Sequence, residues 1–141
     1  LTSRGGLLAL IALVAACAGP APSPTPAGAE TIFEALASRG ATVTGIVGGD
    51  PGCDEADLVD NAIRFELRGR NETVPRTVHL FTFRDRMAFE AAATSFRRCL
   101  ATVLAGAGER VDSFESSPYR LLARGLSDED LRLLREILTA R

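Results

Sequence analysis

Apolar and polar residues alternate along two neighbouring stretches in the middle of the chain. Over residues 62–69, apolar side chains alternate with charged ones, which is typical of a strand with one buried face. A second β run covers residues 74–83, and the turn residues 69–72 between the two runs favour a hairpin. Pro75 cannot donate a ladder hydrogen bond, so we expect it at the start or the edge of its strand.

Helical spacing and capping residues predict three helices. A capping box that begins at Thr31 opens a first short helix, and Gly40 suits the left-handed conformation at its end. Asp85 can cap a long helix over residues 86–104, whose apolar stripe follows helical spacing. Ser127 precedes three acidic residues, and these favour a helix start because they lie near the positive end of the helix dipole.

Three further β runs complete the expected domain, over residues 41–48, 111–114 and 119–123, although Gly45 weakens the first. The elements follow one another as α-β-β-β-α-β-β-α. Most neighbouring strands are joined by tight turns. This order predicts an α+β fold with a small antiparallel sheet of about four to five strands and with helices packed mainly on one face.

The first residues carry the pattern of an export signal. Arg4 precedes a ten-residue apolar run, whereas a membrane-spanning helix needs about 20 apolar residues. The run ends in Val14-Ala15-Ala16-Cys17. These four residues resemble a lipobox, the recognition site of bacterial lipoprotein signal peptidase. The resemblance covers about the first 17 residues. It implies cleavage before Cys17 and acyl chains on that residue, enough for stable membrane anchoring.

The chain therefore divides into three expected segments. They are a signal peptide over residues 1–16, a Pro/Ala-rich tether over 17–30 that begins with the lipidated cysteine, and a single α+β extracytoplasmic domain over 31–141. The closely spaced prolines favour an extended tether. Two alternatives remain open. One is a secretory signal cut near Ala16 or Ala18, which leaves a soluble protein, and the other is an uncleaved anchor.

Two cysteines remain once Cys17 is assigned to lipid. An even number of cysteines in an oxidising compartment favours a disulfide, here between Cys53 and Cys99. Two separate buried thiols are an alternative. A redox-active pair is another, but it lacks the Cys-x-x-Cys spacing of such sites.

Carboxylates gather in the loop before residue 62. Asp50, Asp54 and Asp57 are candidates for a Ca²⁺ site. The spacing departs from an EF-hand, because Glu55 stands where glycine is needed and Asn61 where the bidentate Glu is needed. A solvated acidic loop without metal is the preferred interpretation.

His79 is the only histidine, and no nucleophile motif accompanies it. We therefore expect it to be a strand residue at a sheet face or edge, and we predict no catalytic residue and no cofactor. Arg120 and Arg124 are expected on solvated faces.

The net charge of −2 gives no attraction to nucleic acid. We predict a membrane-anchored bacterial lipoprotein that is not an enzyme and whose extracytoplasmic domain binds an envelope protein or a small ligand. The alternatives are a structural or accessory lipoprotein without a small ligand and, least favoured, an extracytoplasmic enzyme. A concave pocket with convergent polar groups would favour ligand binding. A flat sheet face with an apolar patch would favour the accessory role, and a perturbed cluster around His79 or the acidic loop would favour the enzyme.

Overall fold

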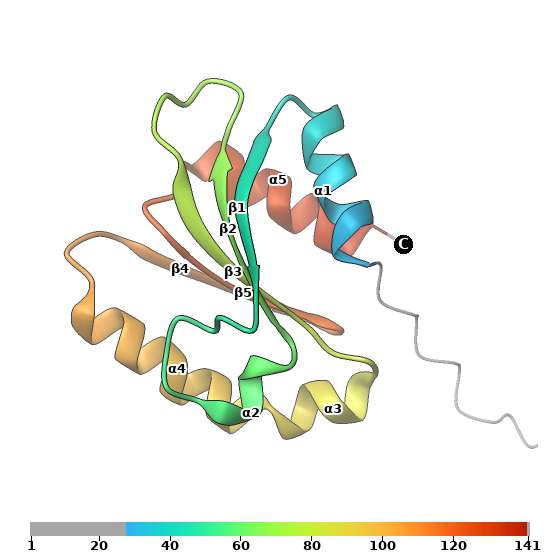
Figure 1. Cartoon of the computed structure of the whole chain (residues 1–141), viewed down its shortest axis with the longest axis vertical. Coiled ribbons are helices and arrows are strands. Elements are labelled where there is room, and N and C mark those ends of the chain that lie inside the picture. The colour runs from blue at the N-terminus through green and yellow to red at the C-terminus, as the bar shows by residue number, and fades with distance from the viewer. Residues whose placement is uncertain (1–27, 141) are drawn as a thin grey trace, which may run out of the picture.

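Five strands pair side by side in the order β1-β2-β3-β5-β4, and every neighbouring pair is antiparallel (Figure 1). The computed structural model describes residues 28–140. The predicted signal peptide, Cys17 and most of the tether therefore lie outside the described residues. The strands are β1 (Thr42–Gly48), β2 (Ala62–Arg68), β3 (Arg76–Thr82), β4 (Val111–Ser116) and β5 (Tyr119–Arg124).

The α+β class, the antiparallel sheet and the predicted hairpin of β2 with β3 are confirmed, and β4 forms a second hairpin with β5. Pro75 lies just before β3, where its missing N–H costs the ladder nothing. The helices are α1 (Ala29–Ser38), α2 (Ala56–Val59), α3 (Arg86–Ala91), α4 (Ala93–Gly106) and α5 (Asp128–Thr139).

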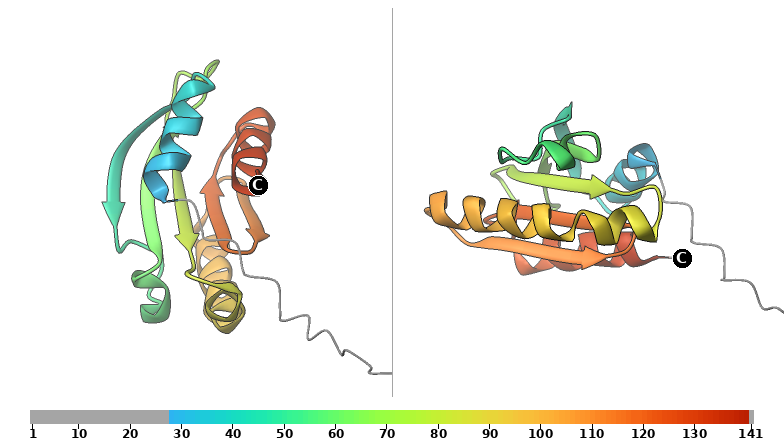
Figure 2. Two further views of the ribbon diagram at one scale, coloured as in Figure 1. Left: turned by 90° about the vertical axis from the view of Figure 1, so that its right-hand side faces the viewer. Right: turned by 90° about the horizontal axis from the view of Figure 1, so that it is seen from below.

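The helices cover both faces of the sheet, which differs from the expectation of one covered face. Val78 and Leu80 of β3 pack with α1 and α5 on one face, whereas Phe81 and Leu122 pack with α2, α3 and α4 on the other. The two groups of helices also lie near opposite ends of the sheet (Figures 1 and 2). The reason is that β3 and β5 are buried along nearly their whole length. Strands that are apolar on both sides need cover on both sides.

The first helix begins earlier than predicted. Its N-cap is Gly28, without a side-chain cap, so the expected capping role of Thr31 is wrong. Its end is as predicted, because Gly40 has a φ of 87°. The N–H of Gly40 donates to the carbonyl of Ala37 at 2.9 Å, and the N–H of Ala41 donates to that of Leu36 at 3.1 Å. These two bonds form a Schellman motif.

The predicted long helix is divided at Ala92 into α3 and α4. Its start is as predicted, since Asp85 Oδ1 accepts from the N–H of Ala88 at 2.8 Å. Near the break, Arg120 Nη2 donates to the Phe89 carbonyl at 2.9 Å. In a continuous helix that carbonyl accepts from the residue four positions later, so the arginine competes with the helix for it.

Strand β1 forms one edge of the sheet and contains a β-bulge. Thr44 lies opposite Glu66, but the next paired residue, Val47, lies opposite Arg64. Two residues of β1 therefore face one residue of β2. Gly45 is the first of the two and has a φ of 60°, as in bulges that use a left-handed glycine.

Candidate functional site

A disulfide between Cys53 and Cys99 ties the loop after β1 to helix α4, as the sequence predicted. The two Cα atoms are 5.4 Å apart, within the usual range for such bonds. Cys99 is fully buried beside Phe96 and Val103 in the core under α4. The bond fixes the Gly-rich loop against the sheet face that carries His79.

His79 lies at a sheet face, as expected, and the disulfide-linked loop covers it so that only 6% of its surface is exposed. Its Nδ1 lies 3.1 Å from the Asp50 carbonyl oxygen, which can only accept, so Nδ1 carries a proton. Gly52 lies over the ring, and a Cβ there would be 2.7 Å from Cε1. Burial lowers the pKa of His79, although the Asp50 carbonyl opposes this effect.

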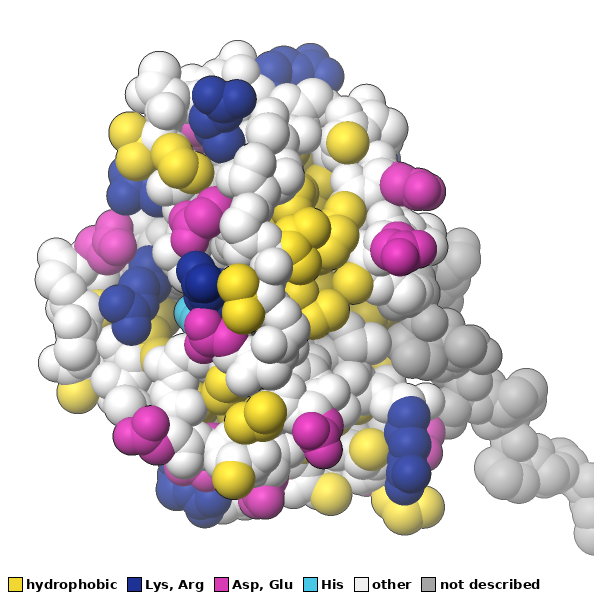
Figure 3. All heavy atoms as spheres, viewed as in Figure 1, with side chains coloured by type: hydrophobic (Ala, Val, Ile, Leu, Met, Phe, Trp, Pro, Cys, Tyr) yellow, Lys and Arg dark blue, Asp and Glu magenta, His cyan; other side chains and the backbone are white. Residues whose placement is uncertain are grey.

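The exposed edge of this region is mixed in charge. Figure 3 shows the histidine as a small area between arginine and acidic side chains. Arg64 lies directly across from His79 on β2, and Arg64 Nε donates to Asp50 Oδ2 at 2.8 Å. The imidazole is therefore covered, and the Asp50 carboxylate beside it is already paired with Arg64.

We predict that His79 titrates below about 6.5, the ordinary value for histidine. In the interval between its folded pKa and that value, the unfolded chain binds more protons than the folded chain. Stability should therefore fall as the pH falls through this interval. Proton NMR of the imidazole checks the pKa, and denaturation of His79→Gln should show less loss of stability over the same pH range. An imidazole pKa at or above 6.5 would contradict the buried neutral ring.

The structure does not bring Asp50, Asp54 and Asp57, the less favoured Ca²⁺ candidates, together as a site. The Asp50 carboxylate is used by Arg64, and Asp57 Oδ2 accepts from Ser95 Oγ at 3.1 Å. Within residues 28–140, no group of three or more His, Cys, Asp or Glu side chains could hold a metal ion. Asp50 instead connects the loop to β2, and Asp57 connects α2 to α4.

Arg120 is buried, so the expectation of a solvated position is wrong. The Cζ of its guanidinium lies 4.1 Å from the ring centre of Phe89 and 5.0 Å from that of Phe96. Nη1 lies 2.9 Å from Glu115 Oε2 as an ion pair without hydrogen-bond alignment. Burial lowers the pKa of Arg120, which Glu115 opposes, yet a guanidinium stays charged at neutral pH. This arginine belongs to the interior and joins β5 to α3.

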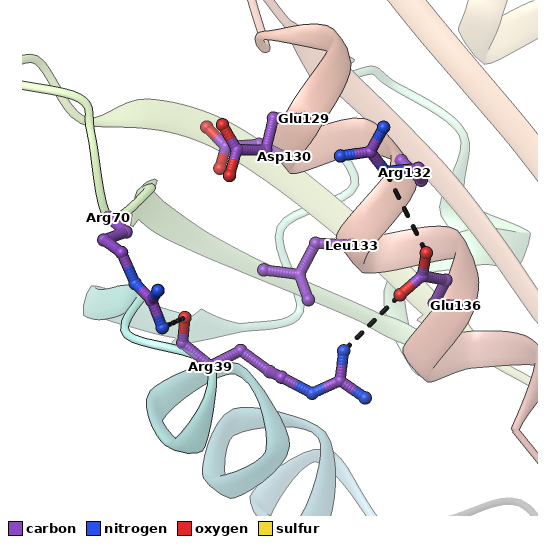
Figure 4. Close-up of a pocket in the computed structure, with 7 residues that line it drawn as sticks. All are labelled: Arg39, Arg70, Glu129, Asp130, Arg132, Leu133 and Glu136. Carbon is purple, nitrogen blue, oxygen red and sulfur yellow. Dashed lines mark hydrogen bonds and ion pairs between the residues drawn. The ribbon is translucent and has the colours of Figure 1, made fainter.

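A concave surface, here named the charged groove, lies between the end of α1, the turn after β2 and helix α5 (Figure 4). Its volume is about 210 Å³. Helices α1 and α5 and the turn after β2 form its walls, so the fold sets the backbone positions of the lining residues. The lining residues are Arg39, Arg70, Glu129, Asp130, Arg132, Leu133 and Glu136.

The first turn of α5 supplies the acidic wall of the charged groove. Ser127 Oγ accepts from the N–H of Asp130 at 3.1 Å, which confirms the predicted cap. The cap places the Asp130 side chain against Gly69, where it is only 4% exposed. Burial raises the pKa of Asp130, Ser127 opposes this, and the nearby charges of Glu72 and Glu129 add to it.

Gly69 allows the turn after β2 to lie directly against α5. A Cβ at Gly69 would overlap the Asp130 carboxylate. We predict that Gly69→Ala lowers the free energy of unfolding by about 1–3 kcal/mol, because the neighbour must move or strain. Urea denaturation measures the loss. In an Asp130→Ala background the same substitution should cost clearly less, and an equal cost in both backgrounds would contradict this contact.

The sequence did not point to the charged groove. Arg39, Arg70 and Asp130 come from three separate segments, and each resembles an ordinary surface charge near a turn or a helix end. The only sequence signal was the acidic first turn of the last helix, which the helix dipole already explained.

Comparison with known protein families, curated proteins and solved structures finds no match to this chain. Among the helices of residues 28–140, none is both long and apolar enough to cross a bilayer.

Proposed function

We propose that this chain is a lipid-anchored bacterial lipoprotein whose α+β domain binds a ligand outside the cytoplasm. The charged groove carries the binding part of the proposal, since it is a concave surface on which polar groups from three segments converge. The location rests on the leader and on the lipobox that ends in Cys17.

The disulfide is in keeping with that location. Bonds of this kind persist in oxidising compartments and are rare in the cytosol of most organisms. Cys53 and Cys99 are joined across 46 positions of the chain, and the bond stabilises a domain of modest size. A domain outside the cytoplasm gains from such a bond because it is exposed to proteases and to changes of pH.

A binding role also agrees better with the surroundings of His79 than catalysis does. The ring is covered by the loop at Gly52, and its Nδ1 is committed to the Asp50 carbonyl. Catalysis by histidine needs reach to a substrate proton. We retain the prediction that the domain is not an enzyme.

Mass spectrometry of the intact native protein tests the anchor. We expect a new amino terminus at Cys17, the mass of the acyl chains on that residue, and the hydrogen loss of one disulfide. Cys17→Ala should move the protein from the membrane fraction to the soluble fraction or leave the leader uncleaved, whereas Ala18→Ser, which keeps the lipobox, should change nothing. An unmodified sulfur at Cys17 in native material would overturn the anchoring proposal.

A further inference from the structure

The charged groove separates its charges into two regions. On one side, Glu136 lies between two arginines, with Oε2 at 3.4 Å from Arg39 Nη1 and Oε1 at 3.9 Å from Arg132 Nε. This side is internally paired. Figure 4 shows the remaining charges: Arg70 lies on the turn after β2, and Glu129 and Asp130 lie above it on the first turn of α5.

Asp130 lacks the cation that a buried carboxylate normally has. It is 96% buried, since its exposed fraction is 4%, and it lines the groove. The charged groups that act most strongly on it are Glu72 and Glu129, which are themselves acids. Among residues 28–140, no arginine forms an ion pair with it. The Asp130 side chain has a hydrogen bond with Ser127, and a ligand cation would supply the opposite charge that it lacks.

The geometry favours an organic ammonium over a metal ion at this wall. Within residues 28–140, the acidic side chains do not gather into a group of three that could hold a metal. Glu129 faces a neighbouring amide, because Asn71 Nδ2 lies 3.5 Å from Glu129 Oε2. One buried carboxylate and one exposed carboxylate can accept hydrogen bonds from an ammonium group, which has three donors.

Arg70 offers the opposite charge. Its Nη2 donates to the Arg39 carbonyl at 3.0 Å, which fixes the guanidinium at the end of α1. Among the described residues, no carboxylate pairs with Arg70. A guanidinium has five N–H donors in a planar fork that matches a carboxylate, so donors remain for a ligand.

The size and the apolar part of the groove limit the ligand further. A volume of about 210 Å³ is below that of the usual pockets for drug-sized ligands, which begin near 300 Å³. Leu133 points between the acidic wall and Arg70 (Figure 4). Three arginines and three carboxylates line the groove, so electrostatic complementarity favours a ligand that carries both charges and is neutral overall.

We propose that the charged groove binds a free amino acid, with the ammonium group at Asp130 and Glu129, the carboxylate at Arg70 and the side chain against Leu133. This inference rests on the proposed binding function, because it names the ligand class of the same groove. The raised pKa of Asp130 agrees with it, because an ammonium group bound beside the carboxylate would favour the ionised form and lower that pKa.

The test uses the mature lipidated chain in detergent micelles and the common L-amino acids as probes at millimolar concentration. Amide chemical shifts should change at residues 69–71 and 129–133 for at least one amino acid. For that amino acid, the analogue without the amine and the analogue without the carboxylate should each bind about tenfold more weakly or worse, a loss of at least about 1.4 kcal/mol.

Variants of the groove separate binding from folding. Asp130→Asn, Glu129→Gln and Arg70→Gln should each weaken binding, and Glu129→Gln is a surface change that leaves the fold intact. Asp128→Asn is the matched control, because it removes the same charge from the same helix turn. The native Asp128 pairs with Arg110 and does not line the groove. Arg135→Gln is the control for loss of an exposed arginine.

Three results would overturn the inference. They are the absence of shifts with every amino acid, binding that survives both Arg70→Gln and Glu129→Gln, and an amine analogue that binds as tightly as the amino acid. Each leaves the anchoring proposal untouched, since the mass of the native protein tests that separately. Conversely, an unmodified Cys17 would overturn the anchor without changing the result in the groove.

Discussion

Replacing Cys53 and Cys99 together with alanine is expected to lower the free energy of unfolding by about 4 kcal/mol. The bond closes a loop of 46 residues. In the chain-entropy account a loop of this length lies between the values for short and long loops, about 3 and 4.7 kcal/mol. Urea denaturation of the native protein and the double variant measures the difference.

A reductant provides the control for this prediction. Reduction of the native protein should cause a loss similar to that of the double variant, and the double variant itself should not respond to reductant. Native protein whose unfolding midpoint is unchanged by full reduction would contradict a stabilising role for the bond. Because the bond holds the loop over His79, reduction should also raise the pKa of His79 toward its ordinary value.

Arg120→Ala is expected to cost about 3–4 kcal/mol of unfolding free energy. The substitution removes the guanidinium from between the rings of Phe89 and Phe96, leaves a cavity, and takes away the donor to the Phe89 carbonyl. Arg120→Met keeps most of the volume and should cost less, because an apolar residue often replaces a buried charge at little cost. Urea denaturation separates the two variants.

The matched control is Arg135→Ala. Arg135 lies over Phe114 at 5.7 Å, but it is exposed on α5, so we expect a loss below about 1 kcal/mol. Equal losses for Arg120→Ala and Arg135→Ala would mean that burial of the guanidinium among the rings contributes nothing.

Local signals predicted most of the elements. The alternation over residues 62–69 identified β2, and the side-chain caps at Asp85 and Ser127 are present as expected. The pairing of Cys53 with Cys99 followed from counting the remaining cysteines. Each of these features depends on neighbours in the sequence or on a choice with few alternatives.

Features that depend on distant segments were missed. We expected Arg120 on a solvated face, because the short β run alone could not reveal that α3 and α4 cover this side of β5. The break at Ala92 lies near the same arginine, which reaches the Phe89 carbonyl of α3 from another part of the chain. Helix α2 was also missed, because four residues give too short a pattern to recognise.

The charged groove could not be predicted for a related reason. Its positive and negative walls come from the end of α1, the turn after β2 and the start of α5, and the packing of α5 against both α1 and Gly69 brings them together. No periodic pattern in the sequence indicates that α5 comes close to the turn at Gly69. Gly69 also suits an ordinary turn, so its presence did not indicate a contact with α5.

The bulge at Gly45 bears on how copies of this protein meet on a crowded bilayer. A lipoprotein held on one membrane, as we propose, encounters its own copies at high local concentration. A flat edge strand would then recruit the edge of a neighbour and extend into fibrils. In β1 the irregularity leaves only residues 42–44 and 47–48 in regular pairing, each shorter than a typical strand. The interrupted edge should therefore hinder such pairing between neighbouring copies.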